Sequence, residues 1–206
     1  MGFYHEKVIK GTTTVGIRIR DGVILAADKR ATAGYYIAHK NVDKIIRVDD
    51  RAALTTAGLV ADAQVLANFL RIEAKYYKYI TGKPMSIKAM ASLLSILLNT
   101  SKYFPYIVQL LLGGYDDAPR LFAIEWFGDV TAEPFTATGS GSPIAIGVIE
   151  ENYREDMSID NAVKLAIRAI TAATKRDSAS GEGIDVAVIT KEGFKKLSYK
   201  LSQTLS

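Results

Sequence analysis

The hydrophobic pattern of this chain changes period several times, and the order of these changes constrains the fold more than any other feature. Segments in which apolar and polar residues alternate indicate strands, whereas apolar residues at helical spacing indicate helices. Asp21-Gly22 lies between two such segments and is typical of a type I′ turn, so we expect antiparallel hairpins. Strands are expected at 12–20, 23–27, 44–48, 52–57, 106–112, 121–126, 130–138, 184–189 and 194–199.

Three helices are expected between the strands. The first follows Gly58 and ends at Gly82 and Pro84. Its buried stripe is expected to contain Val65, Leu66, Phe69, Leu70 and Ile72. The second helix begins at Ser86, a typical N-cap residue, and the third covers 158–174. This order of elements favours a single α+β domain, a layered sandwich with helices packed on the outer faces of antiparallel sheets.

The composition is that of a globular chain with a large core. Of its 206 residues, 49% are hydrophobic and 23% are charged, and a chain of this length buries roughly 70% of its unfolded surface. The absence of cysteine excludes disulfides, thiolate catalysis and cysteine-based metal centres. The longest apolar stretches, 93–98 and 106–112, are far shorter than the ~18 residues of a membrane span. Because the first residues show neither a signal peptide nor a lipid-anchor motif, we expect a cytoplasmic protein with no membrane partner.

The charge distribution gives little support to a nucleic-acid partner. The net charge is +4, but 22 acidic residues are interspersed with 26 basic ones. Lysines and tyrosines alternate over 75–79, as they could on a base-stacking surface. A helix whose tyrosines pack against a neighbour while its lysines face water is the favoured interpretation. We expect no nucleic acid, and a basic module that binds RNA or acidic proteins is kept as an alternative.

Few residue types remain for catalysis. The two histidines, His5 and His39, leave little room for a multi-histidine metal site or a histidine-based triad. Acidic pairs occur in expected turns or near a helix end, where such residues cap and solvate. The glycines of 139–143 have neither the spacing nor the context of a nucleotide-binding loop. We therefore expect no metal and no cofactor.

A run of three threonines follows Gly11 near the start of the chain. Threonine is common in strands, so the run by itself indicates only the start of a strand. A chemical interpretation starts from the α-amino group, whose pKa of about 7.7 to 8.0, against ~10.4 for a lysine side chain, leaves a substantial fraction of it neutral and able to act as a base near pH 7. If the bond between Gly11 and Thr12 were cut, Thr12 would carry a nucleophile and a base on one residue.

Several stretches in the same order resemble the archaeal-type proteasome β subunits, which are N-terminal-nucleophile threonine proteases. The matching stretches are GTTTVG at 11–16, AGLVADAQ at 57–64, VQLLLGG at 108–114, TGSGSP at 138–143 and RDSASGEGIDVAVIT at 176–190. The threonine run alone is a weak signal, whereas the joint match in order and spacing is specific. The resemblance implies a four-layer αββα sandwich, two antiparallel sheets flanked by helices, which agrees with the order of elements above.

The resemblance also implies roles for individual residues. Thr12 corresponds to the nucleophile, and its freed amine would relay the proton. Asp28 and Lys44 correspond to a buried ion pair beside it. The positive charge of Lys44 is expected to lower the pKa of the Thr12 hydroxyl and amine, and Asp28 is expected to keep Lys44 charged. The residues expected to orient the terminal amine and its water are Ser140, Asp177 and Ser180.

Substrate contacts follow from the same resemblance. The backbone N–H of Gly58 corresponds to the oxyanion hole, and Gly58 with Thr32 would pair with the substrate as an added strand. The pocket for the residue before the scissile bond is mostly apolar, which favours hydrophobic or neutral side chains. Its expected lining is Ala31, Val42, Ile46, Thr56 and Val60.

An inactive precursor that cuts itself is a further implication. Gly11 has no Cβ, so the chain can place the Gly11 carbonyl against the Thr12 hydroxyl. An N→O acyl shift followed by hydrolysis would release residues 1–11 as a leader and leave a single domain over 12–206. Unfolded polypeptides would then be cleaved inside a closed chamber of heptameric rings.

The partners implied are proteasome α subunits, other β subunits in a stack of four rings, and a ring ATPase. Exposed tyrosines and leucines of the helices at 60–81 and 86–103 are expected ring contacts. Two alternatives share the fold: an unprocessed, inactive ring subunit that depends on a second β type, and an amidase of the same nucleophile class. Taken singly, the motifs also have plain interpretations, in which Asp28 ends an exposed strand, Lys44 is a solvated edge lysine and 139–143 is only a turn.

Overall fold

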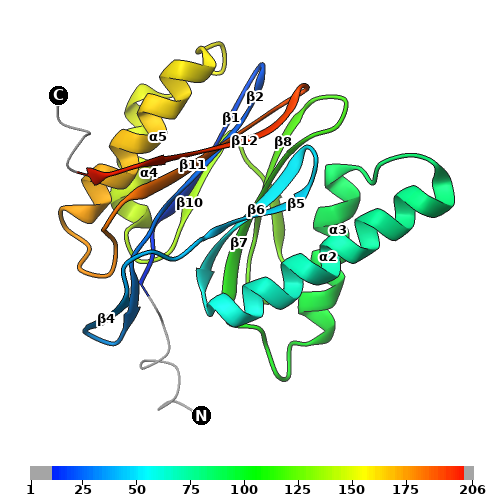
Figure 1. Ribbon diagram of the computed structural model, residues 1–206, viewed down its shortest axis with the longest axis horizontal. Helices are drawn as coiled ribbons and strands as arrows, with labels where there is room; N and C mark the ends of the chain where they lie inside the picture. Colours follow the sequence, from blue (N-terminus) through cyan, green and yellow to red (C-terminus); the bar gives the residue numbers. More distant parts are fainter. Residues whose placement is uncertain (1–10, 202–206) are drawn as a thin grey trace.

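Two antiparallel sheets of five strands each form the centre of the structure, a computed structural model that describes residues 11–201 (Figure 1). In the first sheet the strand order is β10-β1-β2-β11-β12. Its strands are β1 (Thr14–Ile19), β2 (Gly22–Asp28), β10 (Phe135–Thr138), β11 (Ile184–Thr190) and β12 (Gly193–Tyr199).

The second sheet follows the chain order β5-β6-β7-β8-β9. Its strands are β5 (Ile45–Asp49), β6 (Ala52–Gly58), β7 (Val108–Tyr115), β8 (Pro119–Ile124) and β9 (Val130–Ala132). Along the chain, a small hairpin of β3 (Ala31–Ala33) and β4 (Tyr36–His39) follows β2 and precedes β5. This hairpin was not predicted.

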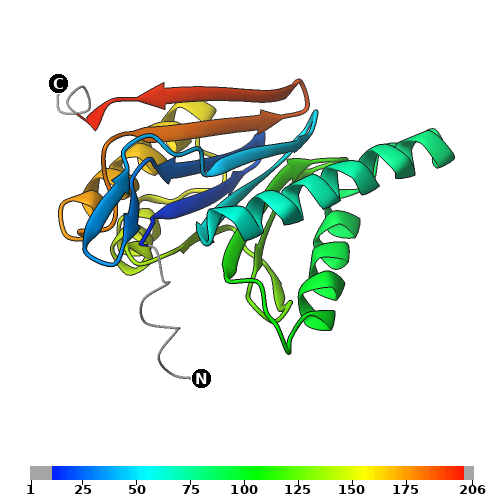
Figure 2. The same ribbon diagram turned by 60° about the horizontal axis from the view of Figure 1, so that its bottom comes forward.

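Helices cover the outer face of each sheet, as the turned view in Figure 2 shows. They are α2 (Val60–Thr81), α3 (Ile87–Thr100), α4 (Ser142–Asn152) and α5 (Ile159–Thr174). Helices α2 and α3 pack on the second sheet through a core that includes Leu66, Leu94 and Leu110. Helices α4 and α5 pack on the first sheet through residues such as Ile17 and Ile170.

A third apolar cluster fills the space between the two sheets. Leu25 and Ala187 of the first sheet meet Ala53 and Leu111 of the second within it. Every one of these side chains is fully buried. The predicted four-layer αββα sandwich is therefore confirmed, with one core between the sheets and one under each helix pair.

The predicted end of α2 and start of α3 are confirmed, whereas the second helix, expected over 86–103, already ends at Thr100. Gly82 adopts the left-handed conformation, with φ 70°, and ends α2. The Ser86 hydroxyl accepts a hydrogen bond from the Ala89 N–H and begins α3. The predicted stripe of α2 was partly wrong, because Val65 and Ile72 are 55% and 64% exposed. Its buried side consists of Ala63, Leu66, Ala67, Leu70 and Ala74.

Two predicted strand features need correction. Arg20 and Asp21 connect β1 to β2, and neither they nor Gly22 has a positive φ, so the turn is not type I′. The single strand expected over 130–138 is two strands, since β9 pairs with β8 in one sheet and β10 pairs with β1 in the other. Pro134 lies between them, and the chain crosses there from one sheet to the other.

Helix α4 was missed because its sequence carries few helix signals. It begins directly after the glycines of 139–141, with Pro143 in its first turn, where the missing N–H of proline does no harm. Gly147 interrupts the apolar pattern of this helix. None of the helices within residues 11–201 is long and apolar enough to cross a membrane.

Candidate active site

The strand ends that carry the predicted catalytic residues meet at one end of the sandwich. Because neighbouring strands are antiparallel, the start of β1 lies beside the ends of β2 and β10, with Thr14 opposite Ala27 and Thr138. The start of β11 lies there too, since Ile184 pairs with Asp28. Residues that are far apart in sequence are thereby brought together around the first residues of β1.

Lys44 and Asp28 form an ion pair that joins the two sheets. Lys44 Nζ lies 2.6 Å from Asp28 Oδ1, and the two side chains are 2% and 0% exposed. Burial lowers the pKa of Lys44 below its ordinary value, while the charge and hydrogen bond of Asp28 act in the opposite direction. The plain interpretations of a solvated lysine and an exposed strand end are therefore wrong.

Four donors surround the Asp28 carboxylate. Its Oδ1 accepts hydrogen bonds from Lys44 Nζ and from the Thr13 N–H at 3.0 Å. Its Oδ2 accepts from the N–H groups of Arg30 at 3.0 Å and Gly181 at 2.9 Å. Asp28 Oδ1 thus links Lys44 to the backbone of Thr13, the residue that follows Thr12.

A second carboxylate, that of Asp177, organises the hydroxyls on the other side of Thr12. Ser140 Oγ and Ser180 Oγ each lie 2.6 Å from Asp177 Oδ2 and donate to it, because an ionised carboxylate only accepts. A hydroxyl has one proton, so Ser180 Oγ must accept from Thr13 Oγ1, 2.7 Å away. Ser140 Oγ likewise accepts from the Thr12 N–H at 3.3 Å.

The direction of these hydrogen bonds separates Thr12 from Thr13. Both polar groups of Thr13 that can donate are committed, its N–H to Asp28 and its hydroxyl to Ser180. The nitrogen of Thr12 instead begins a chain of donors that runs through Ser140 to Asp177. Thr12 itself is buried at 4% exposure.

Glycines allow the backbone to approach Thr12 closely. A Cβ on Gly139, whose φ is 90°, would overlap the Thr12 carbonyl oxygen, and one on Gly141 would overlap Thr13 Oγ1. A Cβ on Gly11 would collide with the side chain of Ala179. The segment 139–143 is therefore more than a turn, because it contacts the candidate nucleophile and leads into α4.

The predicted substrate-binding residues lie at the same end of the molecule. Gly58 ends β6 with φ 112° and pairs with Val108. Thr32 is buried in the β3–β4 hairpin at 4% exposure. Of the predicted pocket residues, Ala31 and Thr56 are buried and Val42, Ile46 and Val60 are half-buried. The Thr56 hydroxyl has no hydrogen-bond partner among the described residues. Their contact with substrate stays a prediction.

Three residues of the site were not singled out from the sequence. Thr13 was seen only as part of the threonine run. Arg30 holds the loop that carries Ser180, with Nη1 2.7 Å from the Ser178 carbonyl oxygen and Nη2 3.1 Å from Glu182. Gln109 Oε1 accepts from the Gly139 N–H at 3.4 Å. Only the position of Arg30, two residues after Asp28, gave a signal that could have been used.

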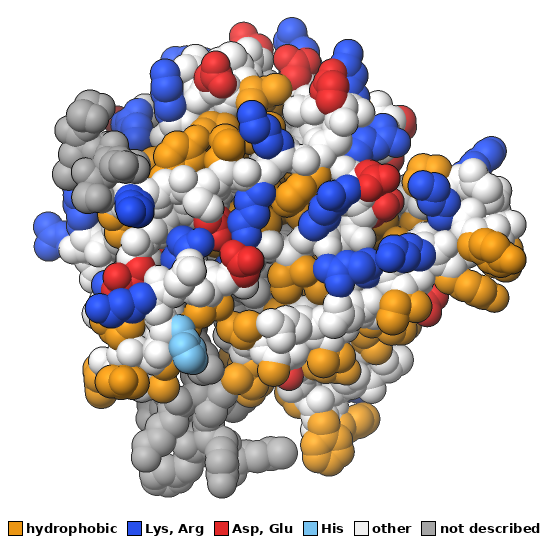
Figure 3. All heavy atoms as spheres, viewed as in Figure 1, with side chains coloured by type: hydrophobic (Ala, Val, Ile, Leu, Met, Phe, Trp, Pro, Cys, Tyr) orange, Lys and Arg blue, Asp and Glu red, His pale blue; other side chains and the backbone are white. Residues whose placement is uncertain are grey.

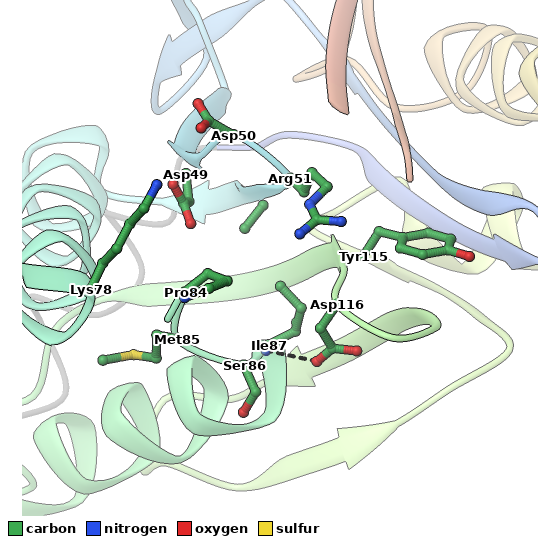
Figure 4. Close-up of a pocket in the computed structure, with 11 residues that line it drawn as sticks. Asp49, Asp50, Arg51, Lys78, Pro84, Met85, Ser86, Ile87, Tyr115 and Asp116 are labelled. Atoms are coloured by element: carbon green, nitrogen blue, oxygen red, sulfur yellow. Dashed lines mark hydrogen bonds between the residues drawn. The ribbon is translucent and has the colours of Figure 1, made fainter. Parts of the chain in front are cut away.

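A different cavity, drawn in Figure 4, lies at the other end of β6. Its volume is about 170 Å³, and Ala52, the first residue of β6, lines it with Arg51, Lys78 and Asp116. The Ile87 N–H donates to Asp116 Oδ2 at 3.0 Å beside it. Since Gly58 ends the same strand, this cavity is separate from the cluster around Thr12. Within residues 11–201 no group of three acidic, histidine or cysteine side chains is placed to hold a metal ion.

Comparison with known proteins identifies the family. The sequence profile described as "Proteasome subunit" matches residues 8–189. This chain belongs to the proteasome subunit family. A proteasome subunit beta 2 of Ignicoccus hospitalis is 56% identical over 199 residues, which cover 97% of this chain and 94% of that protein.

Two further relatives bear related names. A proteasome subunit beta 2 of Sulfolobus acidocaldarius is 52% identical, with 97% of this chain and 98% of that protein covered. A proteasome subunit beta 1 of Saccharolobus islandicus is 49% identical, with 97% and 94% covered. The predicted resemblance to archaeal proteasome β subunits is confirmed.

Membership of the proteasome family implies assembly into rings with other subunits, and α2 offers an apolar surface that this chain leaves uncovered. Hydrophobic side chains gather at the projecting end of α2, on the right of Figure 3. The predicted exposure of tyrosines on these helices is confirmed, but that of leucines is wrong, since every leucine of α2 and α3 is buried or half-buried. The exposed residues are Val65, Ile72, Tyr76, Tyr77, Tyr79 and Ile80 of α2, Ile96 of α3, and Tyr103 and Phe104 beyond it.

Proposed function

We propose that this chain is a catalytic β subunit, a threonine endopeptidase that cuts unfolded polypeptides inside a closed ring chamber in the cytoplasm. One observation carries the proposal. The Thr12 nitrogen donates to Ser140, which donates to Asp177, and on the other side the buried Lys44–Asp28 pair is tied to the Thr13 N–H. A hydroxyl, a nitrogen that can become a base and a buried cation are thus linked to Thr12 and its neighbour Thr13.

The hydrogen-bond direction suits the Thr12 nitrogen to act as a base once it is a free amine. Its N–H donates toward Ser140, so its lone pair is available to accept the proton of the Thr12 hydroxyl, directly or through water. The hydroxyl oxygen then forms a bond to the scissile carbonyl carbon. Lys44 stabilises the deprotonated oxygen electrostatically, and the Gly58 N–H would stabilise the charge on the substrate oxygen.

The second half of the reaction returns the proton. The C–N bond of the substrate breaks, and the leaving amine takes the proton held by the Thr12 amine. The acyl group stays on Thr12 as an ester. Water, deprotonated by the same amine, then hydrolyses the ester and restores the hydroxyl.

Maturation uses the same hydroxyl. It attacks the Gly11 carbonyl, the Gly11–Thr12 amide becomes an ester with release of the Thr12 amine, and water then frees residues 1–11. The close packing of Gly11 against Ala179 supports a fixed position for this carbonyl. Residues 1–10 of the predicted leader lie outside the described residues.

Substrate preference and partners complete the proposal. The pocket of Ala31, Val42, Ile46, Thr56 and Val60 contains no charged side chain, so apolar or neutral residues before the scissile bond are favoured. The partners proposed are the proteasome α subunits, other β subunits in heptameric rings and a ring ATPase that unfolds the substrate.

The proposal is tested with assembled particles that contain wild type, Thr12→Ala, Thr12→Ser or Lys44→Ala. Intact mass should show loss of residues 1–11 in wild type and Thr12→Ser, and an uncut chain in Thr12→Ala. Hydrolysis of apolar peptides should be lost in Thr12→Ala and Lys44→Ala. Full turnover in Thr12→Ala, or peptide cleavage by particles whose chains all retain Met1, would reject the proposal.

An unprocessed ring subunit is the second candidate. The relatives carry the names beta 1 and beta 2, which distinguish two β subunits. If this chain were the structural partner of another β type, its mass would stay that of the full sequence in an active particle. Intact mass of each β chain from the same particle separates the two candidates.

A further inference from the structure

A cavity of about 250 Å³ opens directly beside Thr12, on the side of Ser140. Its walls come from β6, β7, the turn after β8 and the segment between β10 and α4. Its lining residues are Ala57, Gly58, Ile107, Val108, Trp126 and Ser140, together with Gln109 and Gly139. None of the five positions predicted for the residue before the scissile bond lines this cavity.

Two of its lining residues contact Thr12. Ser140 Oγ accepts from the Thr12 N–H, and Gly139 lies so close to the Thr12 carbonyl oxygen that a Cβ would not fit. Gly58, which carries the proposed oxyanion donor, lines another wall. The cavity therefore begins where the reacting atoms of a bound peptide would lie.

The chemistry decides which part of a substrate enters the cavity. The leaving amine has to receive its proton from the Thr12 nitrogen, so it lies beside that nitrogen and its neighbour Ser140. Gly58 then lies at the scissile carbonyl, at the border of the cavity, and the acyl part of the substrate runs away from the cavity along the β3–β4 hairpin that carries Thr32. The chain that follows the scissile bond consequently starts at the mouth of the cavity.

The walls are mainly apolar, and the residues on either side of Trp126 are anchored by hydrogen bonds. Gln109 links the two sides of the cavity, since its Oε1 accepts from the Gly139 N–H and its Nε2 donates to Glu125 Oε2 at 3.0 Å. The turn that carries Trp126 is also tied to α3, because the Asn99 side chain donates to the Phe127 carbonyl oxygen at 3.1 Å. The turn that carries Trp126, one wall of the cavity, is thus held on both sides.

We propose that this cavity binds the side chain of the residue that follows the scissile bond, and that Trp126 makes it select an apolar side chain there. The inference rests on the proposed function and adds a second specificity site to it. An acidic side chain would lose its hydration against Trp126, Ile107 and Val108 without gaining a positive charge beside it, since none of the residues that line the cavity is a lysine or an arginine. An apolar side chain buries its surface there instead.

The test compares two peptides that differ only in the residue after the cleaved bond, leucine or aspartate. Both compete in one reaction with the assembled, matured particle, and mass spectrometry gives the ratio of the two products. We expect wild type to prefer leucine by about 10-fold or more, the discrimination that a few methylene groups give in an apolar pocket. Trp126→Ala should bring the ratio close to one.

Phe127→Ala is the matched control, because Phe127 is the adjacent aromatic residue, is 53% exposed and does not line the cavity. It should keep the wild-type ratio. If Trp126→Ala does not assemble, Trp126→Gln replaces it in the test, because glutamine fills more of the space with a polar side chain. Trp126→Phe should retain most of the preference for leucine. An unchanged ratio in the Trp126→Ala or Trp126→Gln particle, or no preference in wild type, overturns the inference.

Failure of the proposed function gives a different result. If wild type cleaves neither peptide, or Thr12→Ala cleaves both, the catalytic assignment itself is wrong and the cavity loses its role with it. If wild type cleaves, Thr12→Ala does not, and the product ratio ignores Trp126, the assignment of Thr12 stands and only the cavity assignment is rejected.

Discussion

Lys44 and Asp28 form a fully buried ion pair between the two sheets, with 2.6 Å between Lys44 Nζ and Asp28 Oδ1. The pair contacts the backbone at Thr13, one residue from the candidate nucleophile. Burial lowers the pKa of Lys44 and the charge of Asp28 raises it, with burial the larger effect. The charge state of Lys44 therefore depends on its partner, and this dependence can be measured.

Asp28→Asn should move the alkaline limb of the pH–activity profile to lower pH. The substitution removes the charge that raises the pKa of Lys44, so Lys44 loses its proton, and its effect on Thr12, at lower pH. Activity at neutral pH should fall about 100-fold or more, as when one electrostatic group of an active site is removed. The pH dependence of kcat/KM for an apolar peptide is the measurement. Asp43→Asn, which changes an exposed carboxylate next to Lys44, should keep the wild-type profile, and an unshifted limb in Asp28→Asn would contradict the prediction.

Asp185→Asn should destabilise the fold in a pH-dependent way. Burial raises the pKa of Asp185, but hydrogen bonds from Ser198 and Lys29 and the charge of Lys196 outweigh it, so the pKa lies below its ordinary value. A carboxylate with a lowered folded pKa contributes stability above about pH 4, and this contribution is lost as pH falls through the folded value. We expect a loss of about 1.5–3 kcal/mol at pH 7, the contribution of hydrogen bonds to a charged group whose lysine partners remain partly hydrated, and a smaller loss at pH 3.

Urea unfolding at the two pH values measures the effect of Asp185→Asn. Asp43→Asn is the matched control, because Asp43 also pairs with Lys196, at 2.7 Å, but is 72% exposed. Exposed pairs contribute about 1 kcal/mol or less. Equal losses for the two variants would show that burial of Asp185 does not raise its contribution to stability. A loss for Asp185→Asn that grows toward acid pH would contradict the lowered pKa of Asp185.

Gly139→Ala should prevent maturation, whereas Gly147→Ala should make the fold more stable. A Cβ at 139 would overlap the Thr12 carbonyl oxygen in a backbone of positive φ, so the loop must shift and maturation should fail. Gly147 lies in α4 with open space around it, and alanine there should stabilise the fold by about 0.4–1 kcal/mol. Intact mass and the midpoint of thermal unfolding distinguish them. Normal removal of the leader in Gly139→Ala would argue against close contact at Thr12.

Thr13→Val should slow maturation without moving the cleavage site. The variant keeps the Thr13 N–H bond to Asp28 but leaves Ser180 Oγ without its donor, at a cost of about 1–3 kcal/mol in stability. Thr13→Ser restores the hydroxyl and should behave as wild type. The mass of the processed chain should still correspond to a start at Thr12. A processed chain that begins at residue 13 would transfer the nucleophile role to Thr13.

Most of the architecture could be predicted because it depends on local patterns. The caps at Gly82 and Ser86 and the strands of the first sheet follow from residue types that act over a few positions. The misassigned strand over 130–138 shows the limit, because nothing local reveals that β9 and β10 pair in different sheets. Likewise, Val65 and Ile72 fit a buried stripe by periodicity, yet this chain leaves them exposed.

The candidate site was predicted in part, by residue type and by resemblance. Asp28, Lys44, Ser140, Asp177 and Ser180 were named from the family resemblance, and the structure brings them together around Thr12 and Thr13. Gln109 and Trp126 were not named, because a glutamine in one strand and a tryptophan after another carry no signal of a shared cavity.

The sequence by itself determined the kinds of elements, their order and the chemical groups available, because propensity, periodicity and side-chain type are local properties. Only the tertiary structure decided which groups meet. The Thr12 nitrogen and Ser140 are 128 residues apart, and their contact exists because antiparallel pairing places the start of β1 beside the end of β10. That packing also decides the direction of each hydrogen bond, the burial of Lys44 and the position of Trp126. Which group donates a proton, and how much water a charged group loses, depend on neighbours that come together only when the chain folds.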